Sequence, residues 1–213
     1  MWQSKLKYVS PSFGIQFQSQ NIIGSLDFTW FTITTLLRYH TNPLLTSILF
    51  RNTAQSSGVL EGNSCNVTTL NFSNFTLTNG ADLFSNANLT SLTFKSSGNI
   101  GGLRVYNTKI ATLDLSGWTI NSLLYAYSNT SLTSIIFSLN ANSGALSIAN
   151  TRIVTLNLAT FRVNGLFESN GNTALTSLSF ANLNNILATF TTSGATSLTS
   201  INFTYTTNTG SIS

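Results

Sequence analysis

Small hydroxyl and amide side chains recur at a regular spacing in this sequence of 213 residues. The clearest examples are three pairs, each with one apolar residue between its members: Thr69 and Asn71, Thr112 and Asp114, and Thr155 and Asn157. Residues two apart project from the same face of an extended strand. Such an array has the chemistry to bind ice or a glycan. It equally suits an exposed sheet that needs small polar groups only for solubility and close stacking.

Catalytic chemistry has little to use in this sequence. His40 is the only histidine, and no cysteine or acid recurs near it at the spacing of a metal site. Asp27 and Asp114 occupy equivalent outward positions, but four stacked coils at about 4.8 Å each would separate them by about 19 Å. The paired carboxylates of glycosidases lie roughly 5 to 9.5 Å apart. We therefore expect no enzyme, no cofactor and no metal.

The composition argues for a packed protein that does not bind nucleic acid. Charged residues make up 7% of the chain, against about a quarter in typical soluble domains. The nine Lys and Arg residues are scattered, whereas a nucleic-acid binder gathers its cations into a patch or stripe. The 15 Phe residues exclude the aromatic-poor composition of disordered chains.

No targeting or membrane segment is expected from the sequence. The first residues, MWQSKLKYVSPSFGIQFQSQ, contain no apolar run followed by a small-residue cleavage site, so we expect no signal peptide. No stretch approaches the roughly 18 uninterrupted apolar residues of a spanning helix, so we expect no membrane insertion. Cys65 is the only cysteine, which rules out an intramolecular disulfide and favours a small buried or half-buried residue.

A repeat of 21 to 23 residues organises the chain. Each copy follows the pattern apolar-x-x-apolar-x-apolar. The nine copies are Ile23/Leu26/Phe28, Leu45/Ile48/Phe50, Val67/Leu70/Phe72, Leu89/Leu92/Phe94, Ile110/Leu113/Leu115, Leu132/Ile135/Phe137, Ile153/Leu156/Leu158, Leu175/Leu178/Phe180 and Leu198/Ile201/Phe203. A period this constant is the signature of a solenoid.

The spacing within each copy predicts β-structure. The second and third apolar positions alternate with a polar residue, so both face inward from a strand. The first apolar position must turn inward at a bend. Another apolar residue, such as Val59 or Leu103, follows fourteen positions after the first and indicates a second extended segment. We expect a mainly β, single-chain solenoid of about nine coils over 21–213, with residues 1–20 as an N-terminal cap or attachment segment.

Asparagine recurs three residues before the first apolar position of most copies. The predicted structural ladder comprises Asn86, Asn107, Asn129, Asn150 and Asn172, with Asn42 at the same position of an earlier copy. Asparagine tolerates turn conformations, and its amide can bond to the backbone of a neighbouring coil. We expect these side chains to form a ladder along one corner of the solenoid.

A slower rhythm, of about 43 residues, lies on top of the first. Alternate copies carry a bulky aromatic residue eight positions after their first apolar residue: Phe31, Phe75, Trp118 and Phe161. Each is followed two positions later by an aliphatic residue. This pattern predicts that the rings fill one wall of the core; an exposed stripe that stacks on carbohydrate is the alternative.

The segments NTALTSLSF, NTSLTSIIF and NTKIATLDLSG resemble leucine-rich repeat proteins, especially the short, strand-rich repeats of bacterial surface proteins. The resemblance covers residues 21 to about 203. Phe75, Trp118 and Phe161 stand where the usual pattern has asparagine, which favours a straighter solenoid than a horseshoe. The resemblance implies recognition, adhesion or structure more than catalysis.

These observations lead to one functional expectation and two alternatives. We expect a non-enzymatic structural or adhesion protein in a phage virion, such as a tail, spike, fibre or head-decoration subunit. Its partners would be other virion proteins or copies of itself at the solenoid ends, and a glycan or protein of the host surface. The alternatives are a leucine-rich-repeat binding module on a bacterial cell surface and an extracellular ice- or glycan-binding solenoid that acts alone.

Overall fold

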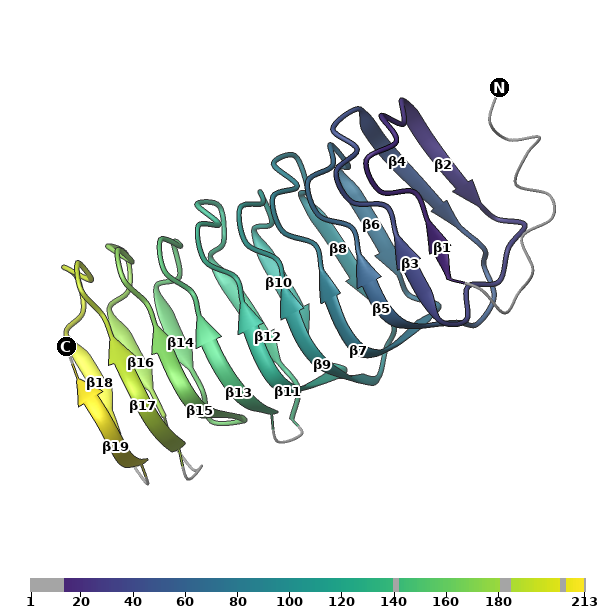
Figure 1. The fold of residues 1–213 in the computed structure, drawn as a ribbon. Coiled ribbons are helices and arrows are strands. Elements are labelled where there is room, and N and C mark those ends of the chain that lie inside the picture. The colour runs from purple at the N-terminus through teal and green to yellow at the C-terminus, as the bar shows by residue number, and fades with distance from the viewer. Residues whose placement is uncertain (1–13, 140–141, 181–184, 204–205, 213) are drawn as a thin grey trace.

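The chain winds into a β-solenoid (Figure 1). The structure is a computed structural model that describes residues 14–139, 142–180, 185–203 and 206–212. These residues form strands and turns and contain no helix, so none of their segments is a helix long and apolar enough to cross a membrane. Every pairing between named strands is parallel, from β1 near the N-terminus to β19 near the C-terminus. The predicted mainly β solenoid is confirmed.

One continuous sheet runs the length of the molecule. Its strands, in spatial order, are β1 (Ile15–Gln16), β3 (Leu36–Arg38), β5 (Gln55–Glu61), β7 (Phe75–Asp82), β9 (Gly98–Arg104), β11 (Trp118–Tyr125), β13 (Asn142–Ser147), β15 (Phe161–Glu168), β17 (Asn185–Thr191) and β19 (Thr206–Ile212). Each strand pairs with the strand of the next coil. The first of them, β1, lies within the segment 1–20 that the sequence assigned to a cap or attachment; residues 1–13 lie outside the described residues.

Nine shorter strands coincide with the nine sequence copies, and they fall into separate sheets. These sheets are β2 (Gly24–Phe28) with β4 (Leu45–Phe50), β6 (Thr69–Phe72) with β8 (Ser91–Phe94), β10 (Thr112–Leu115) with β12 (Ser134–Phe137), and β14 (Thr155–Asn157) with β16 (Ser177–Ser179) and β18 (Ser200–Asn202). The long sheet is therefore continuous, whereas the short strands are grouped mostly in pairs.

The predicted apolar columns line the core. Leu70, Leu113 and Leu156 are all buried, as are most of the second-segment residues. Four positions depart from the predicted columns: Ile23, Val59, Ile201 and Phe203. Ile201 and Phe203 are 37% and 38% exposed, because β18 is the last strand of its sheet. Ile23 is 78% exposed, because Asn21 adopts a positive φ and the β2–β4 register shifts before Ser25, so that Ile22 packs on the core instead. In the coil of β5, the inward residue is Leu60, because Val59 pairs with Gly80 on the outer face.

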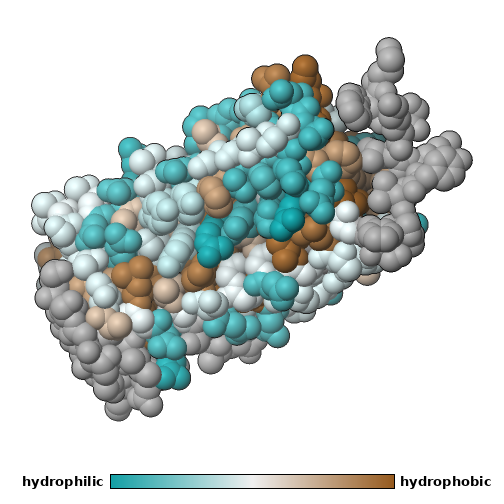
Figure 2. Space-filling view, viewed as in Figure 1, coloured by the Kyte–Doolittle hydropathy of each residue, from teal (hydrophilic) through white to brown (hydrophobic). Residues whose placement is uncertain are grey.

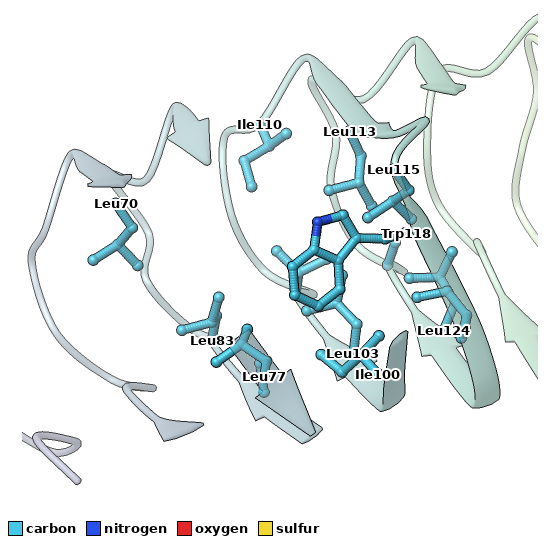
Figure 3. Close-up of a cluster of buried hydrophobic side chains, with 14 of the residues drawn as sticks. Leu70, Leu77, Leu83, Ile100, Leu103, Ile110, Leu113, Leu115, Trp118 and Leu124 are labelled. Atoms are coloured by element: carbon cyan, nitrogen blue, oxygen red, sulfur yellow. The ribbon is translucent and has the colours of Figure 1, made fainter. Parts of the chain in front are cut away.

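The alternating aromatic residues fill the core, as the packing interpretation predicted. Phe75, Trp118 and Phe161 are buried, and Phe31 is partly buried against the core. Figure 3 shows the indole of Trp118 extending from its own strand into the space beside Ile100 and Leu103. An added Cβ on Gly98 would lie 2.9 Å from this ring. The indole N–H donates a hydrogen bond to the Lys95 carbonyl.

Buried asparagines clamp the coils together two by two. The Oδ1 of Asn129 accepts hydrogen bonds from the Thr108 N–H at 2.7 Å and from the Thr108 hydroxyl at 3.0 Å, and its Nδ2 donates to the Val105 carbonyl at 2.9 Å. Asn86 makes the matching contacts to Cys65 and Gly62. Each clamp side chain bonds to the preceding coil, and the short strands of every two clamped coils pair with each other. The strand β18 also pairs with β16, but Ala195 stands at its corner in place of the asparagine.

The structure divides the predicted asparagine ladder into two sets. Asn42, Asn86, Asn129 and Asn172 are fully buried clamps. Asn107 and Asn150 are exposed, with φ of 53° and 55°, and they align with Ser85 and Ser128 rather than with the clamps. The single ladder was therefore a wrong prediction: in these two coils the corner is one residue shorter, so asparagine takes the left-handed turn position instead.

Glycines in the long sheet accommodate a change of register between coils. Ile100 and Gly102 of β9 pair with Ile120 and Leu123 of the neighbouring strand β11. One residue lies between the first two and two residues lie between the second two, so the register shifts by one residue. Gly58, Gly101 and Gly144 recur at this shift. A Cβ on Gly101 would lie 2.1 Å from the backbone oxygen of Asn79, so only glycine allows this close approach.

Tyr39 lies fully buried against the next coil, where a Cβ on Gly62 would be 2.1 Å from its ring. The Tyr39 hydroxyl has no hydrogen-bond partner among the described residues. Because a buried unpaired hydroxyl costs roughly 1 to 3 kcal/mol, Tyr39→Phe is expected to raise the free energy of unfolding by about 1 kcal/mol. Urea titration checks this result, and a loss of stability would contradict it.

Candidate functional site

The predicted binding face is exposed. Thr69 and Asn71 lie on β6, Thr112 and Asp114 on β10, and both Thr155 and Asn157 on β14, and all six side chains face solvent. Within a pair of coils most of them are in register with small polar residues, as where Thr69 pairs with Ser91 and Asn71 with Thr93, but Asp114 pairs with Ile136, which is 44% exposed. The structure therefore brings these residues together with their pair partners.

Half of this face has a structural task. The Oδ1 atoms of Asn71, Asp114 and Asn157 each accept the backbone N–H two residues further along the chain, at 2.9 Å. Asp27 does the same at 2.8 Å and also accepts the Thr29 hydroxyl, which lowers its pKa. These hydrogen bonds form Asx turns, and these four lie in the first coil of their pairs.

The face is also interrupted. β6 pairs with β8 and β10 pairs with β12, but β8 and β10 belong to different sheets, and so do β12 and β14. Thr69, Thr112 and Thr155 thus lie on three separate sheets rather than on one ladder. An ice-binding surface needs a regular array, so this arrangement favours the interpretation in which the face provides solubility and stacking.

The ionisable residues are dispersed over several coils and over both the long sheet and the short strands. Arg38 holds Glu61 in a two-pronged ion pair at 2.8 and 3.0 Å, and His40 Nε2 lies 3.6 Å from the same carboxylate. Asp27 and Asp114 remain on different coils. The described part of the chain contains no group of three or more His, Cys, Asp or Glu side chains that could hold a metal ion.

A second candidate surface was not predicted. Phe84, Tyr106 and Tyr127 project outward where the chain leaves β7, β9 and β11, and Tyr125 lies beside Tyr127; we call these four residues the aromatic ridge. The ring centroids of Phe84 and Tyr106 are 4.6 Å apart and those of Tyr106 and Tyr127 are 4.2 Å apart, with interplanar angles of 7° and 11°. All four side chains are partly exposed.

Charged groups flank the aromatic ridge. Arg104 pairs with Asp82 at 2.8 Å, and the hydrogen bond that the guanidinium donates to Asp82 raises the pKa of Arg104. Partial desolvation, a hydrogen bond with Tyr106 and the nearby charge of Glu168 raise the pKa of Tyr127 to about 12. In the view of Figure 2 the surface is mainly hydrophilic to neutral, with brown atoms in separate groups. The aromatic ridge thus combines ring surface with polar neighbours.

The repeat contained a signal for this ridge. Phe84, Tyr106 and Tyr127 each follow the first apolar residue of their copy by seventeen positions. At the same position of the next two copies stand Ala149 and Asn170, so the aromatic column lasts only three coils. A sequence search for columns beyond the core positions would have found it.

Cys65 takes the corner position that Thr108 and Thr151 occupy in equivalent coils, since its N–H also donates to a clamp asparagine. The thiol is 5% exposed and unpaired with another cysteine. Burial raises its pKa to about 11, and a backbone hydrogen bond with Asn42 partly opposes the increase. The predicted buried cysteine is confirmed.

A pH titration of stability tests this burial. Well below pH 9 the thiol is protonated in both states. The unfolded thiol ionises around its ordinary pKa of 9.0, and the folded one ionises only around a pKa of about 11. Stability is therefore lost as pH rises through this window, by about 1 kcal/mol between pH 9 and 10. Urea titrations at the two pH values should show this loss in the wild type and a smaller one in Cys65→Thr. Equal losses would contradict the prediction.

Compared with protein-family models, with curated proteins and with solved structures, the chain has no significant match.

Proposed function

We propose that this chain is a non-enzymatic structural and adhesion subunit, and that it belongs to a phage particle, where it contributes a straight, stacked scaffold to a tail, spike, fibre or head. The observation that carries the proposal is the continuous ten-stranded parallel sheet combined with an exterior of small uncharged polar residues. A parallel ladder of this length is stiff along its axis and positions its outer side chains at a fixed spacing. A surface subunit needs both properties.

The end of the stack at β18 favours contact with a partner chain. Ile201 is 37% exposed and Phe203 is 38% exposed, although the equivalent residues Leu178 and Phe180 of the preceding copy are fully buried. Apolar columns that open onto a strand edge favour association with another chain. We infer that this edge contacts another virion protein or a second copy of the chain.

Light scattering on the purified chain tests the assembly role. We expect species larger than a monomer at micromolar concentration, and a shift towards monomer in Ile201→Asp. Leu139→Asp is the matched control, because Leu139 is 93% exposed but lies far from this edge. A monodisperse monomer in the wild type would contradict the proposal. Mass spectrometry of purified particles then tests whether the chain is a virion component.

A leucine-rich-repeat module of a bacterial surface protein is the second candidate. The NTxLTxLxL-like segments favour it, since in this structure they contain the clamp asparagines and the inward Leu residues that stack in columns. A module of this type is expected to bind its partner as a monomer. The light-scattering result therefore separates the two candidates.

A further inference from the structure

The two ends of the solenoid differ in the side chains that they expose. At the C-terminal end, Ile201 and Phe203 are 37% and 38% exposed. At the N-terminal end, Leu26 and Phe28 hold the same positions of the first copy and are 6% and 0% exposed. Phe17 packs against Phe28 there, with ring centroids 6.0 Å apart. Among the residues described at the two ends, these apolar columns are therefore open only at the C-terminal end.

The C-terminal end also has two strand edges. In Figure 1, β18 and β19 stand at the end of the stack. β18 pairs with β16 and β19 pairs with β17, and each is the last strand of its sheet. Within the described part of the chain, both strands thus have a neighbouring strand on one side only. Phe203 is covered on one side by Phe180, whose ring stacks on it at 5.3 Å and 7°.

This end lacks the usual protection of an edge strand. Residues 169–213 contain no Asp, Glu, Lys, Arg, His or Pro. Proteins commonly prevent association at an edge strand with charged side chains or proline. At the other end of the stack, β2 carries Asp27, and the hydrogen bonds from Thr29 lower the pKa of this carboxyl. It is therefore charged at neutral pH, so the N-terminal edge has a protecting charge that the C-terminal edge lacks.

An uncharged end suits contact with an identical end. In a twofold interface the same surface patch of both chains meets, so a residue near the axis lies close to its own counterpart. A charge at such a position would face a like charge, which costs binding free energy. Contact with a different protein commonly uses complementary charges for specificity. The neutral composition of 169–213 favours a second copy over a different protein.

We propose that the C-terminal end of the solenoid binds the same end of a second copy of this chain in a closed twofold dimer. A twofold axis perpendicular to the strands sets β18 antiparallel to β18 of the second copy, and β19 antiparallel to its counterpart. The strand edges then gain antiparallel backbone hydrogen bonds. Ile201 and Phe203 of both copies enter one shared core, so the surface that is open in one chain is covered in the dimer.

This inference rests on the proposed structural role and specifies its partner. Head-to-tail contact would need a matching apolar surface at the N-terminal end and would produce a growing filament. Leu26 and Phe28 are already covered there, so we expect association to stop at two chains. The dimer is a rod of twice the length, with both N-terminal ends pointing away from the contact.

The test uses charge at Ser200, which is exposed on β18. Sedimentation velocity of the full chain at micromolar concentration is expected to show a dimer and no larger species. Ser200→Lys and Ser200→Asp are each expected to weaken the dimer at least about tenfold, because like charges meet near the axis. An equimolar mixture of the two variants is expected to regain an affinity within about threefold of the wild type. Recovery on mixing requires that the same edge of two copies meets.

Ser25→Lys is the matched control, because Ser25 has the same position in the first copy and is exposed on β2. It is expected to leave the dimer unchanged. A monomeric wild type, species that grow beyond two chains, a mixture that stays monomeric, or an equal loss in Ser25→Lys would each overturn the proposal. If a Ser200 variant fails to fold by circular dichroism, the size of the wild-type species still decides.

Mass spectrometry of particles reports the virion role separately. A dimer that is absent from particles would remove the proposed function and leave this contact in place. A chain that is found in particles but polymerises head to tail would leave the proposed function in place and remove this contact.

Discussion

Asn129→Ala is expected to lower the free energy of unfolding by about 4 kcal/mol. The substitution removes both bonds from Thr108 to Asn129 Oδ1 and the bond from Nδ2 to the Val105 carbonyl. All three groups lie in the interior, where an unpaired donor or acceptor costs roughly 1 to 3 kcal/mol. Urea denaturation followed by circular dichroism measures the change.

Asn107→Gly is the matched control for the clamp. Asn107 is exposed and has a φ of 53°, which glycine adopts without strain. We expect its stability to stay within about 0.5 kcal/mol of the wild type. A loss in Asn129→Ala no larger than that of the control would show that the buried amide does not hold the coils together.

Gly101→Ala is expected to destabilise the fold by about 3 kcal/mol or to prevent folding. The new Cβ would lie 2.1 Å from the Asn79 backbone oxygen, and a backbone atom cannot move aside as the end of a flexible side chain can. Relief requires separation of β9 from β7 beside Gly101, and overpacking of this kind costs roughly 1 to 3 kcal/mol or more. Thermal denaturation and expression of soluble protein report the effect.

Gly58→Ala provides the comparison, because Gly58 occupies the equivalent shift one pair of coils earlier. Its added Cβ would lie 3.2 Å from the Thr35 oxygen, which a displacement of a few tenths of an ångström relieves. We expect a loss of about 1 kcal/mol. Similar losses at the two positions would mean that the close carbonyl contact does not govern the tolerance of these glycines.

The architecture could be predicted from the sequence because its strongest signals are local. Leu92, Thr93 and Phe94 alternate within one strand, and the same alternation returns at a constant period, so solenoid and strand follow together. The alternation of Phe75, Trp118 and Phe161 likewise predicted the two-coil unit. Ile23 and Val59 failed because a one-residue change of register reverses which side chain faces inward.

The candidate site was harder to predict because it depends on contacts between coils. Asn71, Asp114 and Asn157 were recognised as outward-facing, but their backbone hydrogen bonds depend on the turn that follows. The aromatic ridge requires Phe84, Tyr106 and Tyr127 to coincide in three successive coils, and it ends where Ala149 takes their position in the next coil. Only the registers of the long sheet establish those alignments.

The clamped pair of coils limits how such a molecule can change in length during evolution. Removal of one coil would bring two asparagine corners, or two threonine corners, against each other and leave their amides or hydroxyls without complementary groups. Removal or duplication of a complete pair preserves every interlocking contact. Variants of different length that still fold should therefore differ by multiples of about 43 residues. Each added or lost pair of coils changes the length of the solenoid by about 10 Å.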